Sequence, residues 1–142
     1  MRLPRSLSGW TMAVFGALAA ALGVVGLVAP DALLSVMGFE PVPGGGRADG
    51  DHTLVFLTSS SMAALNMGVY YVLAALADWK AFFRWTVPFR LLTFTVFTLA
   101  VVTGRAPAGF LGVGLWEGFG AVVTGVALRY EKRAAAGAEA RA

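Results

Sequence analysis

The chain has 142 residues, of which 58% are hydrophobic and only 13% are charged, with a formal net charge of +3. Soluble domains are about 45–50% apolar and about 25% charged, so a single soluble core cannot account for this composition. The sequence has no Cys and one His, which excludes a disulfide framework, a thiolate metal site and multi-histidine ligation of zinc or haem. We therefore expect neither a metal nor a cofactor.

Four apolar runs follow one another along the chain. A membrane-spanning helix needs about 20 mostly apolar residues at a rise of about 1.5 Å each, and we predict spans at residues 9–29, 53–77, 81–103 and 108–130. The outer loop, 30–52, should begin with a short interfacial helix and continue through a flexible Gly-rich link. The polar tail, 131–142, is expected to fray into solvent.

The connection around Asp78 is very short, which forces the second and third spans into an antiparallel hairpin. The predicted fold class is all-α: an integral membrane, antiparallel four-helix transmembrane bundle that forms a single domain. Such a bundle has the lipid bilayer as its first partner.

Basic residues indicate the orientation of this bundle. Arg47 and Arg105 fall on one side, and the other side, which holds both termini, carries Arg2, Arg5, Lys80, Arg84, Arg129, Lys132, Arg133 and Arg141. By the positive-inside rule both termini are cytoplasmic, in a multi-pass protein of the cell's inner (plasma) membrane. The charge thus marks topology, and no nucleic-acid partner is expected. The basic cluster after the last span is interpreted as a stop-transfer anchor, with an anionic-lipid site as the alternative.

Three strongly polar residues interrupt the apolar runs. Counting from the outer helix ends places Glu117 about 15 Å deep, and Arg90 and Asn66 about 20 Å deep. An unpaired charge at such depth costs at least about 2.5 kcal/mol, so we predict a bidentate Arg90–Glu117 pair with the Asn66 amide filling a remaining position. A cluster that only sets helix register and packing is the alternative. The predicted ligand-binding residues are Glu117, Arg90, Asn66, Tyr70 and Trp116.

Glycines surround Glu117 in the last span, at Gly112, Gly114, Gly118, Gly120 and Gly125. Gly114 and Gly118 form a small-xxx-small step, and the first span offers Gly16, Ala20 and Gly23 as a partner face. Such glycines either admit a neighbouring helix or leave room for a ligand beside the carboxylate. They also suggest a homodimer, or a partner membrane protein, assembled through glycine-rich helix faces.

Three short motifs carry a family resemblance: GVYYVLAA in the second span, TVPFR in the third and EGFGAVVTGVAL in the fourth. With four spans of this length, the chain resembles the small four-helix bacterial membrane proteins called DoxX-like, and among them the BphX-like proteins. The matching positions are Thr86, Val87, Arg90, Glu117, Gly120, Ala121 and Thr124. The resemblance implies an association with quinone-linked oxidoreductase complexes or with aromatic degradation.

The residues leave several functions open. The first is a binding or accessory protein that holds a small lipophilic ligand, such as a quinone, isoprenoid or aromatic compound, at the Arg90–Glu117–Asn66 cluster; it predicts a cavity open to lipid. The second is a proton-coupled transporter that uses Glu117, although Arg90 would oppose loss of the carboxylate charge. The third is a membrane isomerase or hydratase with Glu117 as acid or base, against which the lack of further catalytic candidates counts. A purely structural subunit predicts a dry cluster with no adjoining pocket.

Overall fold

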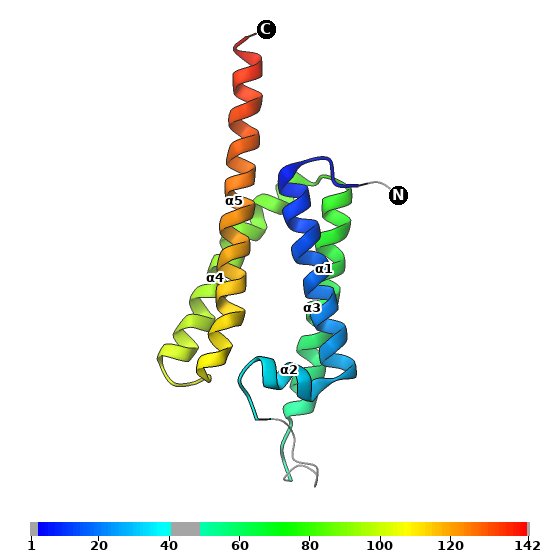
Figure 1. The fold of residues 1–142 in the computed structure, drawn as a ribbon, viewed down its shortest axis with the longest axis vertical. Coiled ribbons are helices and arrows are strands. Elements are labelled where there is room, and N and C mark those ends of the chain that lie inside the picture. The colour runs from blue at the N-terminus through cyan, green and yellow to red at the C-terminus, as the bar shows by residue number, and fades with distance from the viewer. Residues whose placement is uncertain (1–2, 41–48, 142) are drawn as a thin grey trace.

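The regular structure of the chain is helical (Figure 1). The computed structural model describes residues 3–40 and 49–141. Its elements are α1 (Leu7–Val28), α2 (Pro30–Val36), α3 (Thr53–Leu76), α4 (Lys80–Val102), the 3-10 turn η1 (Ala108–Phe110) and α5 (Leu111–Glu139). The predicted all-α fold class and the short helix after the first span are confirmed, whereas Arg47 and the Gly-rich link lie outside the described residues.

The four long helices carry most of their apolar side chains on the outside. Each is long and apolar enough to cross a membrane, and only 11–28% of its most apolar window is buried within the molecule. In water such a surface would be unstable, but in a bilayer lipid covers it without cost. The helices therefore indicate a multi-pass membrane protein.

The helices associate as two pairs. α1 packs along α3 and α4 packs along α5, and the pairs meet mainly where α1 contacts α5 (Figure 1). Glycine makes the first pairing close: a Cβ atom on Gly68 of α3 would lie 2.5 Å from the Ala20 nitrogen and the Gly16 oxygen of α1. The predicted partner face of α1 is thus used by α3 and not by α5, and Gly114 and Gly118 of α5 instead approach Phe97 and Phe94 of α4.

The turn between α3 and α4 has an unusual residue at its key position. Trp79 N–H donates to the Ala74 carbonyl at 3.0 Å and Asp78 N–H to the Ala75 carbonyl at 3.1 Å, which is the Schellman arrangement of a helix C-terminus. The residue that must adopt a left-handed conformation there is Asp78, with φ of 50°. Glycine usually takes this place, and it does at Gly104 after α4, with φ of 71°. The presence of Asp78 in place of glycine is explained by its side-chain contacts, which are described below.

The prediction that the polar tail frays into solvent is wrong, because α5 continues through Glu139. The stretch after Tyr130 is rich in Ala, the strongest helix former, and its first residue, Glu131, is bound to α1 and α4. Beyond Glu131 the side chains are exposed. The last span and the tail therefore form one continuous helix that projects beyond the other helices (Figure 1).

Candidate functional site

Arg90 and Glu117 form an ion pair between α4 and α5. The Nε atom of Arg90 donates a hydrogen bond to Oε2 of Glu117 at 2.8 Å, and the side chain of Arg90 is only 4% exposed. The predicted pairing of these two residues is confirmed. Because both come from apolar helices, the contact removes most of the cost of an isolated charge in lipid.

The guanidinium of Arg90 contacts residues of three other helices, α1, α3 and α5. Its Cζ atom is 4.3 Å from the centre of the Phe15 ring of α1 and 5.9 Å from that of Tyr71 of α3, distances at which cation–π attraction operates. On α5 it lies against Gly120, where a Cβ atom would be 2.1 Å from Nη2 and 2.3 Å from Cζ. Residue 120 therefore has to be glycine for Arg90 to occupy this place.

One hydrogen-bonding group of this site is unsatisfied. The Nη1 atom of Arg90 is buried and has no hydrogen-bond partner in the described part of the chain. The bidentate contact expected from the sequence is not formed, and Nε alone bonds to Glu117. A buried donor without an acceptor costs about 1–3 kcal/mol. The partner side chain, Glu117, remains 24% exposed, so the pair is not sealed.

The structure does not bring Asn66 or Tyr70 to this pair. Both are exposed, and across residues 3–40 and 49–141 no hydrogen bond joins either of them to Arg90 or Glu117. A helix turns about 100° per residue, so Asn66 and Tyr70, each two positions from Gly68, lie about 160° from the face that meets α1. Tyr71 is one position further and reaches the guanidinium instead.

Trp116 lines a groove beside the pair. Its ring centre is 4.4 Å from that of Phe15, the residue whose ring also contacts Arg90. The groove runs between α1 and α5, has a volume of about 360 Å³ and is walled mainly by apolar and aromatic side chains, among them Trp10, Phe15, Trp116 and Phe119. Neither Arg90 nor Glu117 lines this groove. Phe15 lies between the groove and the pair, because its ring lines the groove and also contacts the guanidinium of Arg90.

A second polar cluster, which sequence reasoning missed, joins the start of α1 to the α3–α4 turn and to α5. Glu131 accepts hydrogen bonds from Ser8 N–H at 2.7 Å, Ser8 Oγ at 2.9 Å and Lys80 Nζ at 2.7 Å. Lys80 also lies 3.2 Å from Asp78, which accepts a hydrogen bond from Ser6. A signal was present in the sequence: Glu117, Thr124 and Glu131 are spaced by seven residues and so share one face of the last helix.

The charge on Asp78 is stabilised by this cluster. Partial burial alone would raise the pKa of Asp78, but the hydrogen bond from Ser6 and the hydrogen bond and charge of Lys80 outweigh burial and lower the pKa below its ordinary value. These contacts explain why Asp78, rather than glycine, occupies the left-handed position after α3.

Comparison of the chain with protein-family models, with curated proteins and with solved structures gave no match. The likeness to the DoxX-like proteins thus stays a prediction from the short motifs quoted above.

Proposed function

We propose that this is a small binding or accessory protein of the inner membrane that holds a lipophilic molecule carrying a hydrogen-bond acceptor. The apolar part of the ligand lies in the groove between α1 and α5, against Trp116 and Phe119. Its acceptor oxygen accepts a hydrogen bond from the buried Nη1 atom of Arg90 once the ring of Phe15, which separates the groove from the guanidinium, moves aside. A quinone, with a planar ring, carbonyl oxygens and an apolar tail, has this chemistry.

The observation that carries the proposal is the unsatisfied Nη1 group. Natural proteins pair nearly all their buried donors, and those that stay unpaired usually await a water, an ion or a ligand. Pockets for small molecules combine apolar walls with few polar groups, which matches an aromatic groove next to the free Nη1 group of one guanidinium. A contact with one carboxylate uses at most two of the five guanidinium N–H groups, so the pair with Glu117 leaves donors of Arg90 for a further acceptor.

The proposal includes the orientation of the bundle. The four helices span the membrane in antiparallel order, with the Ser8–Lys80–Glu131 end and both termini on the cytoplasmic side. Supporting this orientation, exposed Trp79 and Trp85 lie close in sequence to the basic residues Lys80 and Arg84, as interfacial anchors do.

Transport and catalysis receive less support. A proton carrier would have to release Glu117 from the 2.8 Å hydrogen bond with Arg90 in every cycle. An acid–base enzyme needs a second polar group near the substrate, and Asn66 and Tyr70 lie on the exposed face of α3. We retain membership of the DoxX-like and BphX-like proteins as part of the proposal, and their association with quinone-linked complexes makes a quinone the first probe.

Quenching of Trp116 fluorescence by decylubiquinone tests the proposal. The chain has four Trp residues, and Trp10→Phe, Trp79→Phe and Trp85→Phe together leave Trp116 as the only emitter. In detergent, we expect saturable quenching that reports a dissociation constant. Replacing the pair in this background by Arg90→Met with Glu117→Gln should weaken binding roughly 10- to 100-fold, the effect of one hydrogen bond to a charged donor.

Arg105→Met is the matched control, because Arg105 is exposed in the turn between α4 and η1 and contacts neither the groove nor the pair. It should leave the dissociation constant unchanged. Quenching that is linear in quinone, or equal in all three proteins, would show partition into the micelle and refute a site at Arg90.

A further inference from the structure

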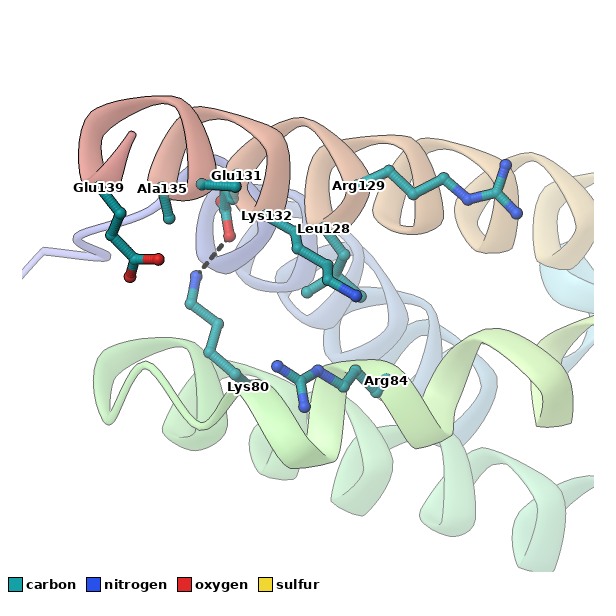
Figure 2. Close-up of a pocket in the computed structure, with 9 residues that line it drawn as sticks. Lys80, Arg84, Leu128, Arg129, Glu131, Lys132, Ala135 and Glu139 are labelled. Carbon is teal, nitrogen blue, oxygen red and sulfur yellow. Dashed lines mark hydrogen bonds and ion pairs between the residues drawn. The ribbon is translucent and has the colours of Figure 1, made fainter. Parts of the chain in front are cut away.

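A second hollow lies at the end of the molecule that holds the Ser8–Lys80–Glu131 cluster. It is formed by the first turns of α4 and the projecting end of α5 and has a volume of about 820 Å³ (Figure 2). Figure 2 shows Lys80 rising from α4 to Glu131 of α5, with Arg84 lying along α4 and Lys132 and Glu139 descending from α5 into the same space. Nothing in the Arg90 site or its proposed ligand uses this hollow.

The charges of the hollow do not balance. Lys80 is already bound to Glu131 at 2.7 Å, whereas Arg84, Arg129 and Lys132 are exposed and form no ion pair within the described residues. Against these three free cations stands one further carboxylate, Glu139. The hollow therefore attracts an anion with more than one charge-bearing oxygen, and its two Arg side chains suit the geometry of phosphate.

An apolar groove continues from the hollow along the same two helices. Its volume is about 260 Å³, Arg129 lines both spaces, and the remaining walls are apolar: Val87, Leu91, Ala121, Val122, Gly125 and Val126. The missing side chain of Gly125 helps to keep the groove open, since its nearest neighbour across the gap is Val87, 3.7 Å from an added Cβ atom. A polar basic hollow thus joins an apolar groove at one arginine.

We infer that α4 and α5 together form a binding site for one anionic phospholipid. The phosphate and headgroup lie between Arg84, Arg129 and Lys132, and an acyl chain follows the groove past Gly125. Clusters of Lys and Arg next to a transmembrane helix recognise anionic headgroups, and here the apolar groove adds the binding of a chain that a soluble phosphate lacks. The orientation proposed above places this lipid in the cytoplasmic leaflet. The rest of the inference does not depend on that orientation.

Native mass spectrometry of the detergent-purified protein tests this site. The probes are palmitoyl-oleoyl phosphatidylglycerol, the corresponding phosphatidylcholine and soluble glycerol 3-phosphate. We expect phosphatidylglycerol to bind as a single retained lipid, at least tenfold more tightly than the other two. Arg84→Gln, Arg129→Gln and Lys132→Gln combined should weaken it about 100-fold, since each basic residue near an anionic headgroup contributes about fivefold.

Two further variants separate a built site from general charge. Arg5→Gln, Arg133→Gln and Arg141→Gln remove the same charge outside the hollow and should change binding less than threefold. Gly125→Leu fills the groove and should weaken phosphatidylglycerol at least fivefold. The inference would be overturned if the two triple variants lost equal affinity, or if Gly125→Leu had no effect. It would also be overturned if both phospholipids bound equally, or if glycerol 3-phosphate bound as tightly as phosphatidylglycerol. Quinone quenching of Trp116 should be unaffected by all three variants, so the two proposals fail separately.

Discussion

At the centre of the bundle, the place of the Arg90 guanidinium depends on the absence of a side chain at residue 120. We predict that Gly120→Ala forces the guanidinium away from Glu117, because the new Cβ atom would lie 2.1 Å from Nη2. The surrounding rings of Phe15 and Tyr71 leave it little room to move. The crowded contact is expected to lower the free energy of unfolding by about 1–3 kcal/mol, the range for an overfilled site, measured by denaturant titration in mixed micelles.

The matched control is Gly125→Ala on the same helix, where the added Cβ atom makes an ordinary contact at 3.7 Å with Val87. Its free energy of unfolding should stay the same or rise by up to about 1 kcal/mol, because Ala is the better helix former. If Gly120→Ala proves as stable as Gly125→Ala, the packing described for Arg90 is wrong.

The sequence predicts part of the Arg90 site and not the rest, for a geometric reason. Counting residues along a helix gives the depth of a side chain, which sufficed to pair Arg90 with Glu117. It does not give the direction in which the side chain points relative to a neighbour, so depth alone predicts Asn66 beside the pair although this residue lies on the exposed face of α3. The roles of Gly120 and Phe15 follow from contacts between helices that only the assembled bundle defines.

Among the elements, the close contact of α1 with α3 depends on Gly68. We predict that Gly68→Ala separates these helices, because its Cβ atom would lie 2.5 Å from backbone atoms of Gly16 and Ala20, and a backbone cannot turn aside as a side chain can. The expected loss in free energy of unfolding is about 3 kcal/mol, the upper range for an overfilled interface. Gly112→Ala, with nothing within 4 Å, should cost nothing in the same denaturant titration, and equal stability of the two variants would contradict the pairing.

The four spans and the short helix were predictable because length and hydropathy alone define them. Which helices pair was not, since a small-xxx-small step such as Gly114 to Gly118 marks a close approach without naming the partner. The glycines of α1, which the sequence offers as a partner face for α5, face α3. Assembly of two copies through glycine-rich faces remains a prediction, although Gly16, Gly23 and Gly68 are already covered within one chain.

The end of α3 should make stability depend on pH. The pKa of Asp78 is lower in the folded protein than its ordinary value, so ionised Asp78 stabilises the fold above that ordinary value, about 4, and the contribution is lost as the pH falls through the lowered pKa. We expect Asp78→Asn to reduce the loss of thermal stability between about pH 5 and pH 3. Asn also tolerates a positive φ, so the turn itself is preserved.

Glu139→Gln is the control for this measurement, since Glu139 is exposed near the end of α5 and takes no part in the Asp78 cluster. Its melting temperature should follow that of the unaltered protein at every pH. A pH profile of Asp78→Asn that coincides with that of the unaltered protein would show that the Ser6 and Lys80 contacts contribute nothing.

At the scale of the whole molecule, orientation can be tested directly because the chain contains no Cys. We predict that a membrane-impermeant maleimide labels Ala108→Cys, in η1, in intact cells and labels Ala138→Cys, in the last turn of α5, only after lysis. The physical reason is the excess of Lys and Arg at the end of the molecule that holds both termini. The reverse labelling pattern would contradict the proposed topology, and labelling of both in intact cells would contradict a closed membrane barrier between them.

The charged end of the molecule contains contacts between helices that composition alone does not predict. Glu131 looks like the first residue of a solvated tail, yet it joins α1 and α4 through Ser8 and Lys80. Each of these residues is ordinary in its own segment, and their meeting depends on how three helix ends converge. The extension of α5 beyond them then creates the hollow in which Arg84 and Lys132 remain free.

The central claim is that the free Nη1 group of Arg90 recognises an acceptor on a lipophilic ligand, and a comparison of two ligands tests it most directly. Decylubiquinone carries carbonyl oxygens, whereas decylbenzene has the same decyl tail and no carbonyl oxygen. The affinity of decylbenzene is obtained from its displacement of the quinone, which restores Trp116 fluorescence. We predict that the unaltered protein prefers the quinone by at least tenfold and that Arg90→Met with Glu117→Gln removes the preference. Equal affinities in the unaltered protein, or a preference that survives in the double variant, would contradict the account.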